Sequence, residues 1–437
     1  MNQSLVQDQP AFFGAWVIRA AFVLAMFGWG VGFYGPPVFL HTVLQRTGWS
    51  LTLVSTAVTL HYLFGALVVA QLPRWHRRIG PGRTAVLGAS VTALGVLGWA
   101  HAAQPWQLFA SALASGGGWV TMGAVAVNAV IAPWFVTTRS MALAKAYNGA
   151  SIGGVVFSPL WVALIAGVGF ASAASLIGGM MVAVMLLLAQ AVFGKSPELL
   201  GQRPDGDAVG AVPSSITSSH ARALPGRQLW RDRRFLTLAL GMALGLFAQI
   251  GLIAHLFSLL VPALGAQFAG VTMGFATACA IGGRFIVARA MPLGTDRRVV
   301  AALAYAVQLA GCVVLWGAGP NNTGLILLGV ALFGSGIGNA TSLPPLIAQV
   351  EFIKEDVARV VALIVAMGQA TYAFAPAVFG AVLAMSAVSG GGAPRIGAGA
   401  TWFFVAAGSV QVLAMLCFLA GRRRENAGDL PPRRARI

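Results

Sequence analysis

The strongest chemical signal in the 437-residue chain is a single arginine, Arg284, inside the apolar run Gln267–Met291. A guanidinium group keeps its proton in proteins, so it cannot avoid the cost of burial by becoming neutral. In the middle of a membrane-spanning helix this cost is roughly 2.5–3.5 kcal/mol, and such residues usually serve a function. No apolar run contains a carboxylate. A bound anion, a chloride ion or cavity water must therefore complete the shell of Arg284.

A guanidinium group binds a carboxylate through two parallel hydrogen bonds. We therefore predict that Arg284 binds the carboxylate of a small organic anion. Two other roles stay open. Arg284 lies seven residues from the end of its run, or roughly 10 Å, so its side chain could extend to the nearer membrane surface, or it could act as a gate.

Other polar side chains inside the apolar runs could line the same hydrated site. We assign to substrate binding, besides Arg284, the residues Tyr34, Thr121, Asn128, Asn339, Gln369 and Tyr372. Each of these also fits a hydrogen bond between neighbouring helices, which is the commoner role. If protons are coupled, His61 or His255 is the expected carrier, because imidazole titrates near neutral pH. A structural role in the core is the more frequent one for either histidine.

Signals for metal or enzyme chemistry are missing from the sequence. It has no group of Cys, His and Asp residues at metal-ligand spacing, and no nucleophile with a base beside it. Gly116-Gly117-Gly118 follows an apolar run and lacks the lysine of a phosphate-binding loop. We predict no metal, no cofactor and no enzymatic activity.

The elements that must position these residues are membrane helices. Hydrophobic residues make up 58% of the chain and charged residues only 9%, against roughly 25% charged in soluble domains. A helix needs roughly 20 apolar residues to cross the hydrocarbon core, and twelve runs reach that length. They are Phe13–Leu40, Leu51–Leu72, Thr84–Ala103, Trp106–Ile131, Ser140–Gly167, Ala171–Gly194, Phe235–Leu260, Gln267–Met291, Val299–Ala318, Gly324–Gln349, Val357–Ser386 and Ala398–Ala420.

A polar segment rich in Pro, Ser and Arg divides these runs into two sets of six. We predict an N-terminal half over residues 1–194, a cytoplasmic linker over 195–234, a C-terminal half over 235–420 and a basic cytoplasmic tail over 421–437. Matches at an offset of 220 residues, such as Gly116 with Gly336 and Arg139 with Arg359, favour two parallel repeats, although chance identity in Gly- and Ala-rich helices also fits.

The basic residues indicate how the chain crosses the membrane. The net charge is +17, but the Lys and Arg residues lie between long apolar runs, which argues against binding to nucleic acid. With both termini in the cytoplasm, the outer loops hold only Arg46 and Arg395, as the positive-inside rule requires. We expect a monomeric multi-pass protein in a plasma membrane of the bacterial inner-membrane type, with the lipid bilayer as its surroundings.

Twelve runs in two halves joined by a basic linker resemble the major facilitator superfamily. The segment from Trp134 to Ala146, followed by Gly149, Gly153 and Pro159, is similar to the fourth and fifth helices of the monocarboxylate transporter family. The resemblance also extends to the oxalate/formate antiporters, and it implies that Arg284 is the substrate-binding arginine of helix eight.

Three departures from that family concern the proton mechanism. Ala280 stands where proton-coupled members have an aspartate, one turn before the arginine. The segment Tyr34-Gly35-Pro36 lacks the lysine of the animal members, and the loop Leu72–Gly80 lacks the acidic residue of the superfamily. These losses favour exchange against a counter-anion, a proton carried by histidine, or uniport.

The sequence thus predicts an all-α membrane protein that moves small organic anions, most plausibly monocarboxylates, by alternating access between two six-helix halves. An exporter of hydrophobic or zwitterionic compounds, such as drugs or siderophores, is the alternative. A membrane receptor or assembly protein that transports nothing is a third reading.

Overall fold

The structure is a computed structural model that describes residues 12–206, 226–292, 295–390 and 396–422. All regular secondary structure in these ranges is helical. Twelve helical stretches are long and apolar enough to cross a membrane. The predicted twelve-helix membrane fold is therefore confirmed.

The first six spans contain eight α-helices, because two of the spans are broken. The first span is α1 and α2, and the fourth is α5, the short 3₁₀ turn η1 and α6. The bounds are α1 Gly14–Gly32, α2 Gly35–Thr47, α3 Leu51–Val69, α4 Leu72–His101, α5 Pro105–Trp119, η1 Val120–Met122, α6 Ala124–Ile131, α7 Arg139–Val168 and α8 Phe170–Leu188, with the π turn η2 Ala189–Phe193.

The second six spans follow the short helix α9 (Gly226–Leu229), and only the eleventh of them is broken. Their bounds are α10 Arg233–Leu264, α11 Ala266–Ala290, α12 Arg297–Gly317, α13 Thr323–Glu351, α14 Lys354–Tyr372, α15 Ala375–Gly390 and α16 Thr401–Ala420. Short 3₁₀ turns lie at Glu198–Leu200 (η3), Pro204–Gly206 (η4) and Ala398–Ala400 (η5).

Several helices are longer than the apolar runs that predicted them. The first span continues to Thr47 rather than ending near Leu40, because α2 carries polar residues through about two more turns. The third span begins at Leu72, and its chain bends at Gly80, which has φ +82°. A positive φ of this kind is readily adopted by glycine. The basic segment before Gly80, expected as a loop, is therefore helical.

Although no apolar run contains a carboxylate, the helices extend beyond the runs, so that Asp356 lies in α14 and Glu351 is the last residue of α13. Its carboxylate pairs with Arg298 of α12, with Nε and Oε1 2.6 Å apart, and the Arg298 side chain is only 1% exposed. The same guanidinium donates to the Thr237 hydroxyl and to the carbonyl of Arg234. With a further bond from Arg298 Nη1 to the Phe418 carbonyl of α16, this buried charge cluster joins four helices of the second half.

Glycines allow neighbouring helices to approach closely in both halves. A Cβ at Gly149 of α7 would lie 2.0 Å from the carbonyl oxygen of Phe22 in α1, and one at Gly283 of α11 would lie 1.9 Å from that of Ser335 in α13. Small residues at such positions are the usual means of packing membrane helices backbone to backbone.

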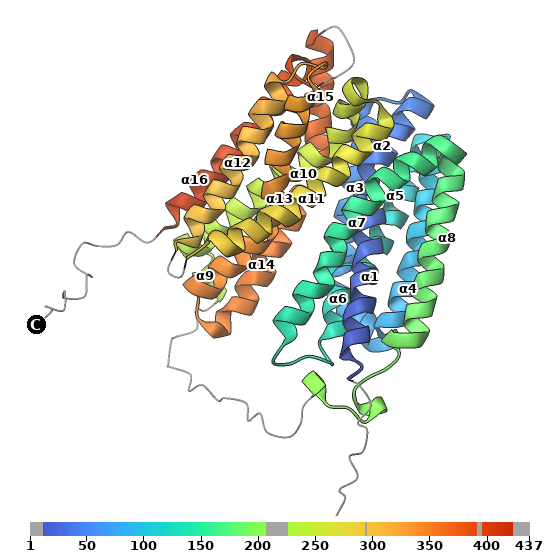
Figure 1. Cartoon of the computed structure of the whole chain (residues 1–437), viewed down its shortest axis with the longest axis vertical. Coiled ribbons are helices and arrows are strands. Elements are labelled where there is room, and N and C mark those ends of the chain that lie inside the picture. The colour runs from blue at the N-terminus through green and yellow to red at the C-terminus, as the bar shows by residue number, and fades with distance from the viewer. Residues whose placement is uncertain (1–11, 207–225, 293–294, 391–395, 423–437) are drawn as a thin grey trace, which may run out of the picture.

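The helices α1–α8 form one bundle and α10–α16 another, as Figure 1 shows. We call the end at which α8 leads into residues 195–232 the linker end, and the opposite end the far end. Across the bundles, α7 packs on α11, α3 on α15, and α2 on α10. Toward the linker end, the lower ends of α1 and α6 stand apart from α14 (Figure 1).

The contacts at the far end join the two bundles through polar groups. The backbone N–H of Ala377 donates to the Thr59 hydroxyl at 3.0 Å. His41 Nδ1 lies 3.3 Å from the Ser258 hydroxyl. A Cβ at Gly380 would lie 2.3 Å from the Ser55 hydroxyl oxygen. The far end is therefore closed by direct contact between the bundles.

The first part of the predicted linker is held against the linker end of the first bundle. The Asp205 carboxylate accepts hydrogen bonds from the backbone N–H groups of Val136, Thr137 and Thr138 and from the Thr138 hydroxyl. Although slight burial opposes it, this set of donors holds the pKa of the Asp205 carboxyl well below its usual range. The linker therefore caps the start of α7.

Candidate functional site

Arg284 lies between the two bundles. Its Nη2 group donates a hydrogen bond to the Ser151 hydroxyl of α7, so the side chain of a second-half helix reaches the first half. Its aliphatic stem passes over Gly338 of α13, where a Cβ would lie 2.6 Å from Arg284 Cγ. The residue is half-buried. The absence of a side chain at Gly338 thus gives the arginine its path.

The Arg284 side chain points into the bundle rather than out of the linker end. Its Cα lies six residues before the end of α11, or about 9 Å, whereas Ser151 lies twelve residues into α7, or about 18 Å from that end. Side chains in a helix incline toward the helix N-terminus, which for α11 is at the far end. The guanidinium group is therefore deeper than its own backbone.

Thr277 precedes Arg284 by seven residues in α11, which is about two helical turns toward the far end. It lies beside the hydroxyl of Tyr34. Tyr34 sits at the break between α1 and α2 and is within electrostatic range of Arg284. Gly154 of α7 makes room for this pair, because a Cβ there would lie 2.7 Å from both the Tyr34 ring and Thr277. Arg284, Ser151, Thr277 and Tyr34 thus form a polar group where three spans meet.

An aromatic cluster continues from Tyr34 to the second bundle. The Phe33 ring is 5.0 Å from Tyr34 and 6.0 Å from Tyr62, and Tyr62 is 6.0 Å from Tyr372 of the second bundle. The Tyr62 hydroxyl donates to the Phe33 carbonyl, and that of Tyr372 lies beside the Gln369 side chain. Three of the predicted binding residues, Tyr34, Gln369 and Tyr372, are therefore brought to the same region.

The structure does not bring Thr121, Asn128 or Asn339 into this group. Thr121 is buried against α4, and its hydroxyl donates to the Gly118 carbonyl. The Asn128 amide donates to the Tyr147 hydroxyl and to its own helix. The Asn339 amide donates to the Ser335 carbonyl, also in its own helix. Each of the three makes the local hydrogen bond that is common for polar residues in membrane helices.

His61 is fully bonded within the first bundle. Its Nε2 is 2.8 Å from the Gly32 carbonyl, which can only accept, so this nitrogen carries the hydrogen. Its Nδ1 is 2.9 Å from the Ser115 hydroxyl, and the Trp99 indole donates to the same oxygen. These contacts tie α3 to α1, α4 and α5 and satisfy a neutral imidazole.

His255 differs because one of its nitrogens is free. Its Nε2 lies 2.9 Å from the Pro376 carbonyl, while Nδ1 is buried with no hydrogen-bond partner in the described ranges. The residue is completely buried near Gly380, in the region where the bundles meet at the far end. Its contacts with Pro376 of α15 and Phe403 of α16 are not shared with the Arg284 group.

Taken together, the group offers one permanent cation, several hydroxyls and an apolar aromatic wall. Among the described residues Arg284 forms no ion pair with a carboxylate. A charged group with only a neutral serine as partner keeps most of its donors available for an anion. The arrangement is suited to bind the anionic end of a small molecule at Arg284 and its apolar end against the tyrosines.

Sequence reasoning missed Ser151, Thr277 and Tyr62. Serine and threonine often bond to their own helix, so their presence in a run carries little information by itself. Tyr62 follows His61 directly, and its place in the aromatic cluster is visible only once the neighbours of α3 are known. The useful signal for Ser151 is its neighbourhood in α7, where Gly149, Gly153 and Gly154 mark a closely packed face.

A sequence model described as the Major Facilitator Superfamily matches residues 20–376. Among solved structures, a mutant of the nucleoside transporter NupG is similar at a TM-score of 0.69, with 13% identity over 93% of this chain and 100% of that one. A bacterial homolog of the human lysosomal transporter Spinster, inward-facing and occupied, has a TM-score of 0.67 and 14% identity, covering 94% of this chain and 97% of that one. No curated protein sequence matches the chain.

Proposed function

The chain belongs to the Major Facilitator Superfamily, and we propose that this membrane transporter moves small organic anions by alternating access, with the anionic group held by Arg284. Membership of this family indicates a transporter and not an enzyme. The observation that supports the anion is the Arg284 guanidinium, which reaches between the bundles and has Ser151 as its hydrogen-bond partner.

Monocarboxylates are the substrate class that we propose. A carboxylate can take two parallel hydrogen bonds from one guanidinium group. The aromatic cluster of Tyr34, Tyr62 and Tyr372 continues from Arg284, and among the described residues no carboxylate pairs with this arginine, which favours a substrate with a single anionic group and an apolar remainder. A second carboxylate on the substrate would have no matching cation there.

We further propose that the linker end faces the cytoplasm, in a plasma membrane. The basic segments Arg74–Arg83 and Arg139–Lys145 lie at that end, and the far end is the one closed by contacts such as Thr59 with Ala377. The structure then corresponds to an inward-facing state, a term that is also used for the Spinster homolog. Substrate bound at Arg284 would neutralise its charge and so favour closure of the bundles around it.

If transport is coupled to protons, His255 is better placed than His61 to carry them. The free Nδ1 of His255 can accept a proton without breaking an existing hydrogen bond, whereas both nitrogens of His61 already have partners. Exchange against a counter-anion would need only Arg284, since two anions can occupy the same guanidinium in turn.

A second candidate is the transport of an uncharged ring compound. The aromatic cluster of Phe33, Tyr34 and Tyr62 favours it, because flat rings stack on such side chains. The similarity of fold to a nucleoside transporter makes nucleosides the natural test compounds.

Uptake by purified protein in proteoliposomes tests the proposal. Radiolabelled lactate, pyruvate and a nucleoside would be compared in the wild type, Arg284→Ala, Arg284→Lys and the control Arg289→Ala, whose side chain is exposed at the end of α11. We expect carboxylate uptake that both Arg284 variants abolish or cut severely and the control keeps. Nucleoside uptake that survives Arg284→Ala would support the second candidate instead.

A further inference from the structure

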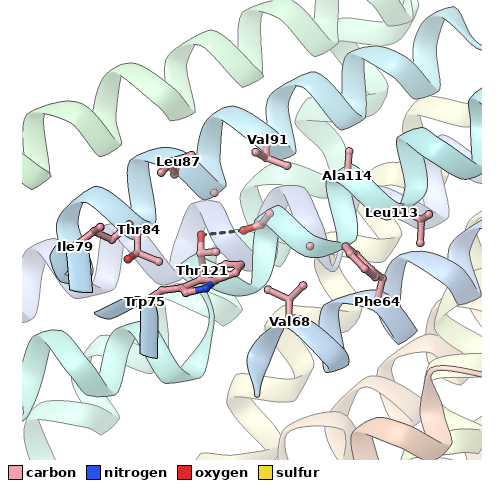
Figure 2. Close-up of a pocket in the computed structure, with 13 residues that line it drawn as sticks. Phe64, Val68, Trp75, Ile79, Thr84, Leu87, Val91, Leu113, Ala114 and Thr121 are labelled. Atoms are coloured by element: carbon pink, nitrogen blue, oxygen red, sulfur yellow. Dashed lines mark hydrogen bonds between the residues drawn. The ribbon is translucent and has the colours of Figure 1, made fainter. Parts of the chain in front are cut away.

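An apolar groove of about 410 Å³ lies on the outer face of the first bundle, between α3, α4 and α5, away from Arg284. Figure 2 shows side chains from these helices around it, with Phe64 and Val68 on α3 and Leu87 and Val91 on α4. Phe64 and Leu87 are 37% and 57% exposed, so the groove opens to the outside of the protein. In a chain with twelve membrane spans, that outside is the lipid.

The polar groups within the groove are already satisfied. The Thr84 hydroxyl donates to the Gly80 carbonyl, and the Thr121 hydroxyl donates to the Gly118 carbonyl, as the dashed line in Figure 2 shows. The floor is made by Gly117 and Gly118 of α5, where the helices approach closely. The groove therefore presents hydrocarbon surface and no free donor among these threonines, which suits an acyl chain.

The groove ends at a basic helical segment. Trp75 and Ile79 line its linker end and belong to the eight residues of α4 that precede the bend at Gly80. Residues four apart lie on the same side of a helix, so Arg74 and Arg78 form a neighbouring face next to Trp75 and Ile79. All four side chains are exposed.

The positive charge of this segment has no acidic partner among the described residues. The sequence contains no Asp or Glu between Asp8 and Glu198. The hydrogen bond given to Arg74 is to the neutral Gln71 side chain, and neither Arg74 nor Arg78 takes part in an ion pair among the described residues. An arginine pair beside a tryptophan at the mouth of an apolar groove matches a lipid phosphate above an acyl chain.

We propose that this groove is a binding site for one anionic phospholipid, such as phosphatidylglycerol. One acyl chain lies in the groove along α4, from Thr84 to Val91, a length of about 10 Å. The phosphate group binds Arg74 and Arg78. Trp75 lies at the level of the headgroup, as interfacial tryptophans do.

Native mass spectrometry of the full-length protein in mild detergent tests this site, with phosphatidylglycerol or phosphatidylcholine added at equal concentration. Two changes would be compared with matched controls. The double variant Arg74→Gln/Arg78→Gln removes the charge. Its control is the double variant Arg231→Gln/Arg233→Gln, which changes two exposed arginines elsewhere at the linker end. Ala114→Phe fills the groove. Its control is Leu94→Phe, at an exposed position of α4 outside the groove.

The wild type should bind phosphatidylglycerol more tightly than phosphatidylcholine, and the arginine double variant should bind it roughly tenfold more weakly or worse. Ala114→Phe should weaken binding of both lipids, and neither control should change it. Equal binding in the double variant and the wild type would overturn the site, as would an equal loss in both charge variants. A dimer that Ala114→Phe abolishes would instead assign the groove to a second copy of the chain.

Discussion

Arg284 of α11 donates a hydrogen bond to Ser151 of α7, so one side chain joins the two bundles between which the substrate is proposed to bind. The serine is neutral, so it does not compensate the charge of Arg284. A ligand anion could take the place of Ser151 without having to displace a carboxylate. The relationship between these two residues therefore provides both a link between the bundles in the unbound protein and a site that an anion can enter.

Ser151→Ala should lower the stability of the ligand-free protein by about 1.5–3 kcal/mol, because a hydrogen bond to a charged group is lost. The loss should shrink when carboxylate is present, since the ligand then takes up the freed donor. Thermal unfolding with and without lactate measures both effects. Ser158→Ala on the same helix is the control, because the buried Ser158 hydroxyl has no partner in the described residues.

Gly154→Val should separate α7 from α11 and destabilise the protein by about 1–3 kcal/mol, as overpacking generally does. The added side chain would begin 2.7 Å from both Tyr34 and Thr277. Gly167→Val is the matched change, because a Cβ at Gly167 meets nothing within 4 Å. Thermal unfolding and uptake would be measured for both, and equal behaviour of the two variants would argue against this packing.

The two ion pairs of the described chain should differ strongly in their contribution to stability. Glu351→Ala leaves the buried Arg298 without its carboxylate and should cost about 3 kcal/mol. Arg422→Ala breaks an exposed pair with Asp296, in which the side chains are 48% and 39% exposed, and should cost less than about 1 kcal/mol. Similar unfolding midpoints for the two variants would contradict the burial of the Arg298 cluster.

Docking of the linker should be insensitive to pH between about 5 and 8. The pKa of the Asp205 carboxyl is lowered in the folded protein, so the stabilisation is present above the ordinary carboxyl pKa and is lost only as the pH falls toward the lowered value. Asp205→Asn keeps only one acceptor oxygen and no charge, so it should weaken the docking to the same extent at every pH in this range. Hydrogen exchange of residues 136–138 measures the docking, and Glu198→Gln, with an exposed carboxyl nearby, is the control.

The sequence predicted the twelve spans because length and apolarity alone determine them. It could not predict the breaks at Phe33–Tyr34 and Ala373–Phe374, since a run stays apolar whether or not its helix is interrupted. Arg284 was identifiable because a charge in an apolar run is rare. Its partner Ser151 was not, because the pair is 133 residues apart and depends on how α7 meets α11. Polar residues such as Thr121 and Asn339 turned out to bond within their own helices.

The most direct measurement is the affinity of the purified protein for a small carboxylate, by isothermal titration of the wild type, Arg284→Ala and Arg289→Ala. Removing one member of a buried charge pair costs about 3 kcal/mol, so Arg284→Ala should bind lactate or pyruvate roughly a hundredfold more weakly. Arg289→Ala should bind like the wild type. Wild-type affinity in a folded Arg284→Ala protein would contradict the assignment of the anion to this arginine.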